Sequence, residues 1–331
     1  MNLPEGKILV TGGAGFIGSA LIHALNQQDR EDILVIDCLG TSEKWRNLVP
    51  LRFHDYLEAD QLLDKMRNEP SQLADIQTVF HLGACSSTME TDAAFLVRNN
   101  YQYSVELAKW ALQNNSRFVY ASSAATYGDG VQGMDDKDEN LAALRPLNMY
   151  GYSKHMFDLH AKRNNWLKQI TGLKYFNVYG PNEDHKGAMR SLVHKAYHQI
   201  KETSRLRLFK SHHPDYKDGE QKRDFLYVKD AVSMTLHLAS LPNAAGLFNI
   251  GSGEARTWME LADAIFAAMD RESDIEFIEI PEEIREKYQY FTRADISKLR
   301  MSGYTIPPTP LADAVKDYVQ NYLAREKRLG D

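Results

Sequence analysis

Residues 7–18 read KILVTGGAGFIG, a short apolar stretch that runs through spaced glycines into the start of an apolar-periodic helix. Gly12, Gly15 and Gly18 stand where any side chain would keep a pyrophosphate away from the backbone. A helix that begins here points free N–H groups and the positive end of its dipole at phosphates. The order of strand, glycine loop and helix therefore predicts a dinucleotide-binding βαβ unit.

An acidic residue ends the next apolar stretch, ILVID at 33–37, and Asp37 lies 19 residues after Gly18. A carboxylate at this place accepts hydrogen bonds from the adenosine ribose hydroxyls, which favours NAD. Lys44 and Arg46 follow closely and would neutralise a 2′-phosphate, which favours NADP. These residues alone leave the choice of cofactor open, and an ordinary solvated role for both cations is equally compatible with them.

Further apolar stretches predict strands at 78–82 and 117–121, with a helix at 92–114 between them. Strands alternating with helices predict an α/β fold, a Rossmann-type doubly wound parallel sheet, with a smaller C-terminal substrate-binding α/β lobe. Later elements are expected as strands at 247–250 and 275–279 and helices at 257–269 and 311–325. We expect a dinucleotide-binding domain at 1–176 with a return segment at about 222–252, and a substrate-binding lobe at about 177–221 and 253–331.

Composition excludes several classes of protein. The 331 residues carry a net charge of −6, which argues against a nucleic-acid partner. No apolar run approaches the roughly 20 residues that span a bilayer, and the N-terminal residues lack a secretory leader, so we expect a cytoplasmic protein without a membrane partner. His212, His213 and Asp215 lie in a polar stretch at 211–221 that reads as a solvated loop, so no metal site is predicted.

Tyr150 and Lys154 are spaced so that both side chains share one face of a helix. A lysine ammonium beside a tyrosine favours the phenolate and makes it a usable base near neutral pH. Tyr197 and Lys201 have the same spacing, but they lie on an amphipathic stretch and are interpreted as packing, as is Trp258. Tyr150 instead follows the stretch that ends at Ser123, whose carboxyl end faces the cofactor crevice of such a sheet.

The glycine loop, Ser123 and the Tyr150–Lys154 pair resemble the extended short-chain dehydrogenase/reductase superfamily, which acts on nucleotide-sugars. In that superfamily the serine, tyrosine and lysine act as a unit, and the tyrosine moves a proton while hydride goes to nicotinamide. The resemblance covers nearly the whole chain, with further matches in HLGA at 81–84, RDFLYV at 223–228 and FNIG at 248–251.

Ala124 and Ala125 stand where dehydratases of the superfamily carry an Asp-Glu pair. Two methyl groups cannot act as acid and base in the elimination of water, so we expect an epimerase, which removes hydride and returns it to the opposite face. A narrower similarity, to the ADP-glyceromanno-heptose 6-epimerase family, lies in GACSST at 83–88, NNYQYS at 99–104, SSAATYG at 122–128 and NVYGPNEDHKG at 177–187.

That family inverts C6 of the heptose in an ADP-linked precursor of the lipopolysaccharide core. A UDP-hexose 4-epimerase, or a related nucleotide-sugar epimerase, is the alternative, although it is less similar at 185–187. A non-catalytic dinucleotide-sensing protein is a remote alternative, because fold alone never proves activity. The joint presence of Ser123, Tyr150, Lys154 and Lys186 argues against it.

The resemblance implies the site residues position by position. Tyr150 and Lys186 would be the two acid/base residues on either face of the reacting carbon, and Ser123 and Lys154 complete the catalytic set. Lys154 would hold the nicotinamide ribose and lower the pKa of Tyr150, while partial burial would lower that of Lys186. The implied cofactor is NADP, with NAD as the alternative, bound by Gly12, Gly15, Phe16, Ile17, Gly18, Asp37, Cys38, Lys44, Leu82, Gly83, Ala84, Cys85, Ser86, Asn99, Lys154 and Val178.

The implied partner is a nucleotide-sugar substrate, and the family also implies a homo-oligomer, a pentamer. The substrate residues would be Ser123, Asn177, Ala188, Lys195, Phe209, Lys210, Ser211, His212, Arg223 and Tyr288.

The chain departs from the family pattern at several of these places. Ala59 stands where the family has a lysine that grips the cofactor phosphate, which weakens the case for NADP. Ala188 replaces a serine, Lys195 replaces a histidine, and the insertion at 211–221 shifts the alignment of 209–212.

Overall fold

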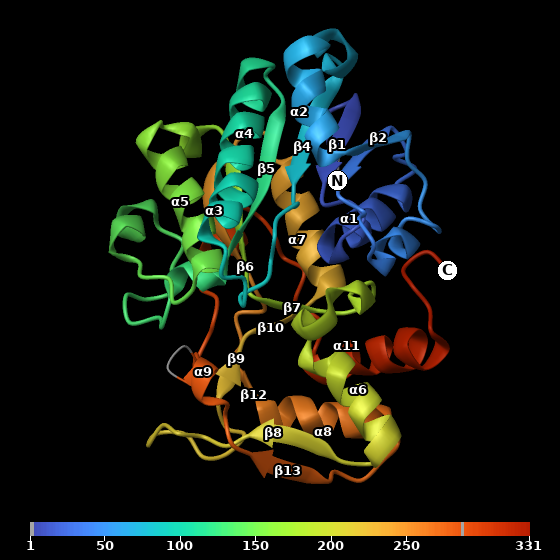
Figure 1. Ribbon diagram of the computed structural model, residues 1–331, viewed down its shortest axis with the longest axis vertical. Coiled ribbons are helices and arrows are strands. Elements are labelled where there is room, and N and C mark those ends of the chain that lie inside the picture. Colours follow the sequence, from blue (N-terminus) through green and yellow to red (C-terminus); the bar gives the residue numbers. More distant parts are fainter. Residues whose placement is uncertain (1–2, 286–287) are drawn as a thin grey trace.

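A seven-stranded, fully parallel sheet forms the centre of the protein (Figure 1). The computed structural model describes residues 3–285 and 288–331. In spatial order the sheet consists of β11 (Gly246–Ile250), β6 (Thr171–Tyr175), β5 (Arg117–Ser123), β4 (Ile76–His81), β1 (Lys7–Thr11), β2 (Ile33–Asp37) and β3 (Asp55–Glu58). The predicted doubly wound α/β fold is confirmed.

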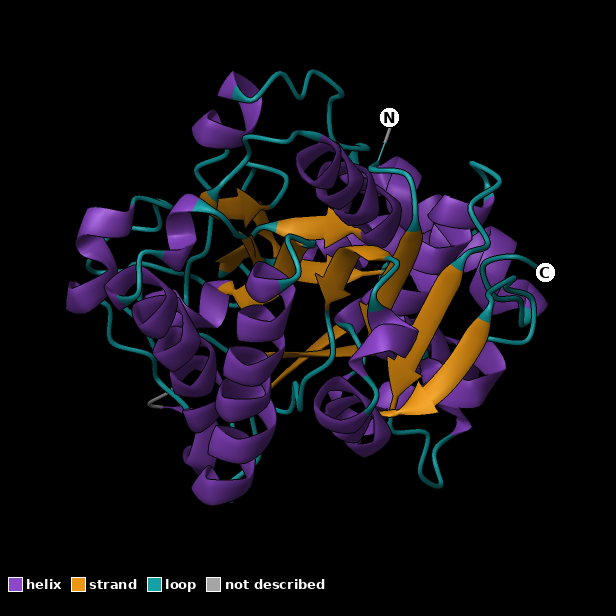
Figure 2. Ribbon diagram, turned by 90° about the horizontal axis from the view of Figure 1, so that it is seen from above, coloured by secondary structure: helices purple, strands orange, loops and turns teal. Residues whose placement is uncertain are grey.

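Helices cover both faces of this sheet, and Figure 2 shows the fanned strands between them. The α-helices of the described residues are α1 (Phe16–Asn26), α2 (Ala59–Asn68), α3 (Ala93–Leu96), α4 (Tyr103–Gln113), α5 (Met149–Arg163), α6 (Leu192–Thr203), α7 (Val228–Ser240), α8 (Trp258–Ala268), α9 (Glu282–Arg285), α10 (Ser297–Met301) and α11 (Leu311–Asp317). Three short pairs complete the strands: β7 (Asn177–Tyr179) with β10 (Phe225–Tyr227), β9 (Lys222–Arg223) with β12 (Arg256–Thr257), and β8 (Leu206–Phe209) with β13 (Ile275–Ile278).

Alternating side chains of the central strands supply two separate cores. In β1, Ile8 and Val10 pack with α1 and α7 on one face, whereas Leu9 packs with α2, α4 and α5 on the other. Side chains of a strand point alternately to its two faces, so a strand buried on both faces must be apolar throughout. This explains why KILVT and ILVID read as continuous apolar runs.

The order of strands reverses between β1 and β4. The chain runs outward from β1 through β2 to β3 and then returns to place β4 on the other side of β1. The loops that follow β1 and β4 therefore diverge and leave a crevice at the carboxyl edge of the sheet. This switch point positions the site described below.

Two strands of the sheet, β3 and β6, were not predicted from the sequence. The edge strand β3 is exposed at Asp55 and only half-buried elsewhere, so it lacks a continuous apolar run. The strand β6 is fully buried, but Gly172 and Lys174 interrupt its apolar pattern. The predicted strands at 78–82 and 117–121 exist with shifted ends, as β4 and β5.

The helix predicted at 92–114 contains an irregular turn. Asp92 caps α3 by accepting a hydrogen bond from the Phe95 backbone N–H at 2.8 Å. A π-helical turn at Val97–Gln102 separates α3 from α4 and holds Asn100 fully buried. Such turns insert one extra residue into the helical repeat and are frequent at functional sites.

The pair β8–β13 packs with α6 and α8 in the lower part of Figure 1, away from the central sheet. The predicted strand at 247–250 is β11, which joins the central sheet beside β6, and the one at 275–279 is β13. The helix predicted at 257–269 is α8, and Thr257 and Glu260 form a capping box at its start. Of the helix predicted at 311–325, only the part up to Asp317 is α-helical, as α11. The chain then continues in a π-helical turn and a 3-10 turn.

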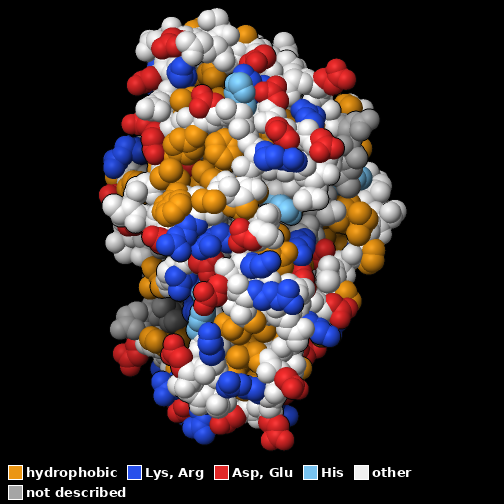
Figure 3. Space-filling model, turned by 90° about the vertical axis from the view of Figure 1, so that its right-hand side faces the viewer, with side chains coloured by type: hydrophobic (Ala, Val, Ile, Leu, Met, Phe, Trp, Pro, Cys, Tyr) orange, Lys and Arg blue, Asp and Glu red, His pale blue; other side chains and the backbone are white. Residues whose placement is uncertain are grey.

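On the face shown in Figure 3, acidic and basic side chains are intermixed, with a group of basic side chains near the middle. Within residues 3–285 and 288–331, no helix combines the length and apolar character that a bilayer span requires.

Candidate active site

The glycine loop lies against the loop that follows β4. Gly12 has a φ of +69°, and a Cβ on it would approach Gly83 Cα to 2.7 Å. A Cβ on Gly18 would lie 2.0 Å from Gly12 O, inside contact distance. Only glycine permits this close packing of loop and helix, and the bare backbone leaves N–H groups open for a pyrophosphate. The residues present therefore fit a dinucleotide.

A pocket of about 480 Å³ opens at this crevice. Most of the residues predicted to bind the cofactor line it: Gly12, Gly15, Phe16, Ile17, Gly18, Asp37, Lys44, Leu82, Gly83, Ala84, Cys85, Ser86, Lys154 and Val178. The lining also includes Ser123, Tyr150 and Lys186, so the structure brings the predicted cofactor and catalytic residues together.

Asp37 and Lys44 form an ion pair at the adenosine end of the pocket. Lys44 Nζ lies 2.6 Å from Asp37 Oδ1, and both side chains are largely buried. The Asp37 carboxylate also accepts hydrogen bonds from the Ala14 N–H at 2.9 Å and the Cys38 N–H at 2.7 Å. Its charge is therefore partly neutralised before a ribose arrives.

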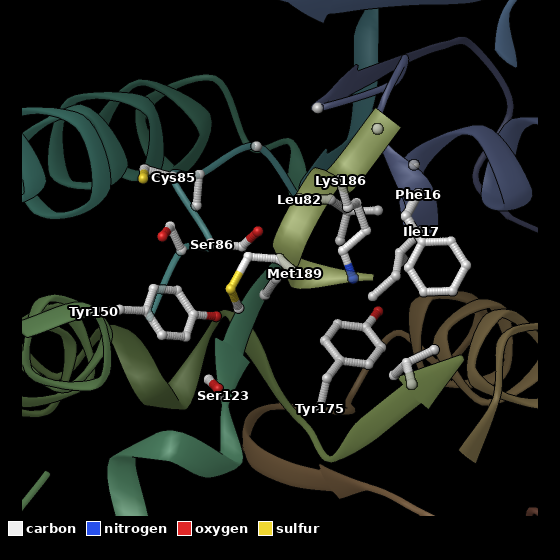
Figure 4. Close-up of a pocket in the computed structure, with 18 of the residues that line it drawn as sticks. Phe16, Ile17, Leu82, Cys85, Ser86, Ser123, Tyr150, Tyr175, Lys186 and Met189 are labelled. Atoms are coloured by element: carbon white, nitrogen blue, oxygen red, sulfur yellow. The ribbon is translucent and has the colours of Figure 1, made fainter. Parts of the chain in front are cut away.

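Tyr150 lies in the first turn of α5, opposite the carboxyl end of β5. Asn148 caps this helix by accepting a hydrogen bond from the Gly151 N–H at 2.8 Å. A Cβ on Gly151 would lie 2.7 Å from Ala125 O, so glycine lets α5 approach the turn after β5 closely. Tyr150 and Ser123 consequently line the same pocket (Figure 4).

The expected electrostatic effect of Lys154 on Tyr150 is corrected by the structure. Burial raises the pKa of Tyr150, the Ser123 hydroxyl lowers it by hydrogen bonding, and the charge of Cys85 raises it. Lys154 instead donates a hydrogen bond to Ala121 O at 2.9 Å, and burial lowers its own pKa to about 8. The Lys154 ammonium is thus bound to a backbone carbonyl of β5 and not to the Tyr150 hydroxyl.

Lys186 lies on the short 3-10 turn Asp184–Met189, and Figure 4 shows it across the pocket from Tyr150, with Met189 between them in this view. Its Nζ lies 4.9 Å from the centre of the Phe16 ring. Burial lowers the pKa of Lys186, the buried Glu183 carboxylate raises it, and Lys195 lowers it. Together these effects place the pKa of Lys186 below that of a lysine in water, as predicted from the sequence.

A second pocket of about 770 Å³ adjoins the first. Ser123, Tyr150, Tyr175 and Phe176 line both pockets, so a ligand in the second reaches the cofactor pocket at the predicted catalytic tyrosine. The predicted substrate residues on the wall of the second pocket are Ser123, Asn177, Arg223 and Tyr288. The Arg223 guanidinium lies near the rings of both Trp258 and Tyr288, at 5.6 and 5.3 Å from their centres.

Several predicted residues line neither pocket. Lys210 and His212 both pair with the exposed Glu279 instead, at 2.8 and 3.1 Å. Lys195 donates a hydrogen bond to Ala188 O at 3.0 Å, and the ring of Phe209 lies 6.4 Å from that of Tyr288. The predicted residues outside both linings are Cys38, Asn99, Ala188, Lys195, Phe209, Lys210, Ser211 and His212.

Other lining residues were missed from sequence. His185 and Met189 lie on the same short turn as Lys186, and all three residues line the cofactor pocket. Trp258, interpreted as packing, lines the second pocket, and its indole donates a hydrogen bond to the Tyr288 hydroxyl at 2.9 Å. Trp258 shares a helix face with the buried Leu261 and Ile265, so the sequence carried no signal that set it apart from a packing residue. Tyr197 does pack in the core, as predicted. Among the described residues, no group of three or more His, Cys, Asp or Glu side chains could hold a metal ion.

Comparison with known proteins agrees with this geometry. Residues 8–251 match the model of the NAD dependent epimerase/dehydratase family. An ADP-L-glycero-D-manno-heptose-6-epimerase of Nitratidesulfovibrio vulgaris is 52% identical over 316 residues, which cover 96% of this chain and 98% of that protein. The chain belongs to the NAD dependent epimerase/dehydratase family.

Solved structures of two epimerases extend the similarity to the fold. The ADP-L-glycero-D-manno-heptose-6-epimerase of Helicobacter pylori is 25% identical with a TM-score of 0.80, over 98% of this chain and all of that one. The UDP-glucuronic acid 4-epimerase of Bacillus cereus, in complex with UDP-glucuronic acid and NAD, is 26% identical with a TM-score of 0.77, over 97% of this chain and all of that one.

The prediction of an epimerase is confirmed by these relatives. In this epimerase the two alanines at 124 and 125 lie in the wall of the second pocket, where elimination would require acid and base groups. Its cofactor is a nicotinamide dinucleotide of the NAD(H) class.

Proposed function

We propose that this epimerase inverts C6 of an ADP-linked glycero-manno-heptose through a transient keto intermediate, in the synthesis of a lipopolysaccharide core precursor. One observation carries the proposal furthest: Tyr150 and Lys186 line a single pocket from opposite sides. An inversion needs a proton-transfer group on each face of the reacting carbon, because one bound nicotinamide presents only one of its faces. The relatives named for the 6-epimerase reaction support the choice of sugar.

The chemistry requires a hydride acceptor, which the bound nicotinamide supplies. In the forward half-reaction one of the two groups, Tyr150 or Lys186, accepts the C6 hydroxyl proton while hydride leaves C6. After the keto sugar has turned its other face to the nicotinamide, the opposite group donates a proton to the oxygen as hydride returns. Each group must come within about 3 Å of that oxygen in its own half-reaction.

The nucleotide part of the substrate would lie in the second pocket. Arg223 is largely buried there, and its planar guanidinium suits bidentate binding of a phosphate. Its contacts with the rings of Trp258 and Tyr288 restrict its orientation. Arg223 also donates to the backbone carbonyls of Lys222 and Gln289, which holds it in place before a ligand binds.

The first test is turnover of ADP-heptose by the purified protein. We expect conversion between the two C6 epimers, followed by proton NMR, with no build-up of reduced cofactor, because hydride returns to the same sugar. UDP-glucose and UDP-galactose serve as comparison substrates. Conversion of these and not of ADP-heptose would show a 4-epimerase, and one reduced cofactor released per sugar would show a dehydrogenase.

We further propose NADP as the preferred cofactor, with Lys44 at the 2′-phosphate. The ion pair with Lys44 offsets the repulsion that Asp37 would exert on a phosphate dianion. Ala59 supplies no second cation, so Lys44 would carry most of the preference.

Replacement of Lys44 by Ala should therefore weaken NADP binding about tenfold more than NAD binding, the effect of about 1.4 kcal/mol from one lost charge contact. Calorimetric titration with both cofactors measures this difference, and native mass spectrometry of the purified wild type identifies the resident cofactor. Arg46→Ala is the control, because Arg46 is half-exposed and pairs with Glu43. An equal loss for both cofactors in Lys44→Ala would contradict the assignment.

The division into a dinucleotide-binding domain and a substrate-binding lobe, the homo-oligomeric state and the cytoplasmic location stay predictions. Gel filtration with light scattering would measure the number of subunits.

A further inference from the structure

Behind the active site lies a fully buried ion pair between Asp158 and Lys174. Lys174 Nζ is 3.1 Å from Asp158 Oδ2, and the two side chains are 1% and 0% exposed. Asp158 belongs to α5, the helix that carries Tyr150 and Lys154, whereas Lys174 belongs to β6. The mechanism described above uses neither residue, and burying two charges is costly unless their surroundings are fully satisfied.

The Asp158 carboxylate fixes the end of β5. Its Oδ1 accepts a hydrogen bond from the Tyr120 hydroxyl at 2.8 Å, and its Oδ2 accepts one from the Ser122 hydroxyl at 2.7 Å. Tyr120 and Ser122 point to the same face of the strand, so the one carboxylate fixes two of the three positions before Ser123.

Lys174 holds Ser123 from its other side. Its ammonium donates to the Thr126 hydroxyl at 2.6 Å, and Thr126 donates in turn to the backbone O of Ser123 at 2.7 Å. The ammonium also lies 4.7 Å from the centre of the Tyr127 ring. Ser123 is therefore held through Ser122 by Asp158 and through Thr126 by Lys174.

Lys154 is tied to the same strand end. It lies one helical turn before Asp158 and donates to Ala121 O, between the two β5 residues that Asp158 binds. The negative charge of Asp158 raises the pKa of Lys154 and opposes the effect of burial. Tyr150 lies one turn earlier on α5, and His81 at the end of β4 is kept neutral because burial lowers its pKa to about 3.

We propose that Asp158 and Lys174 are positioning residues of the epimerase reaction, which hold Ser123 and Lys154 in register with Tyr150. This inference rests on the proposed function for the identity of the substrate. The contacts that support it lie only on the cofactor side of the site. The alternative is that the pair merely stabilises the fold. Buried ion pairs are often replaceable by apolar residues without loss of stability, so the two roles make different predictions.

The decisive comparison is between single and double variants. Asp158→Asn leaves the Lys174 ammonium buried without its carboxylate, and Lys174→Met leaves the Asp158 carboxylate without its cation, so both should lower the Tm. The double variant, Asp158→Asn with Lys174→Met, buries no net charge and should recover most of the Tm. Its kcat should nevertheless remain at least about tenfold below that of the wild type, with little change in KM.

The pH profile adds a readout that a structural role would not move. Without the Asp158 charge, Lys154 loses its proton at lower pH, so the alkaline limb of kcat should shift downward by about half a unit or more in the double variant. Lys174→Arg keeps the cation and should keep both the rate and the profile close to those of the wild type. Asp75→Asn is the matched control, since Asp75 pairs with Lys7 at 3.0 Å but is exposed and at the opposite end of the sheet.

A second measurement does not need the sugar. Lys154 would bind the nicotinamide ribose through its ammonium, so the affinity for reduced cofactor, followed by its fluorescence, should fall as Lys154 is deprotonated. This fall should occur at lower pH in the double variant than in the wild type. If the wild type leaves ADP-heptose unchanged, the proposed function fails while this titration still tests the pair. A double variant with wild-type rate and wild-type pH profiles would overturn the inference.

Discussion

Replacement of Tyr150 by Phe is expected to reduce epimerisation by a factor of about 10²–10⁴, the usual cost of removing a general acid or base. The variant lacks only the hydroxyl, and the ring keeps its place on the wall that the two pockets share. The fold and cofactor binding should therefore be preserved. Measurement of kcat with ADP-heptose, together with circular dichroism and the cofactor content, tests this result.

Tyr152→Phe is the matched control, because Tyr152 lies on the same helix but is 47% exposed. Its activity should equal that of the wild type. If Tyr150→Phe kept full activity, the phenol would have no part in proton transfer, and the assignment of the pocket as a catalytic site would have to be revised.

Replacement of Lys186 by Met is expected to cause a loss of similar size, about 10²–10⁴. The methionine preserves the length and apolar contacts of the side chain beside Phe16, so the loss would report on the amine. Because Tyr150 would still serve one face of the reacting carbon, each single variant should retain one half-reaction. With an analogue that carries an aldehyde at C6, and with reduced cofactor bound, the two variants should therefore deliver hydride to opposite faces of the carbonyl carbon.

The effects of Tyr150→Phe and Lys186→Met should not add in the double variant, because residues that act in one reaction are coupled. Lys201→Met is the control for the second prediction, since Lys201 is exposed on α6 and has the same spacing from Tyr197 as Lys154 has from Tyr150. Full activity in Lys186→Met, or a large loss in Lys201→Met, would refute the assignment of the second base.

The cofactor side of the site was accessible from sequence because its geometry depends on the backbone. Two signals are local in the sequence: a glycine where the backbone must come close to another group, and an acidic residue at the end of the next strand. Gly12 and Asp37 both line the pocket as expected. The fold class followed from the same stretch, since a fully buried parallel strand must be apolar on both faces.

The substrate side was harder because it depends on distant parts of the chain. Whether Lys210 and His212 face a pocket depends on Glu279, some 70 residues later, which pairs with both of them. Trp258 looked like a packing residue until Tyr288 and Arg223 were placed beside it. The relation between Lys154 and Tyr150 was misjudged for a similar reason: helical spacing brought the two residues to one face, but the Ala121 carbonyl on β5 determines where the ammonium lies.

The position of β11 has a consequence for synthesis of the protein on the ribosome. About 70 residues separate β6 from β11, its partner at the end of the sheet. At about 5–20 residues per second, the nascent chain needs roughly 4–14 s to supply that partner. During this interval β6, which is buried along its whole length in the finished protein, would present a free edge that invites pairing with another chain. Slow translation between 176 and 245 should therefore lower the yield of correctly folded protein, and a chaperone that covers exposed strands should restore it.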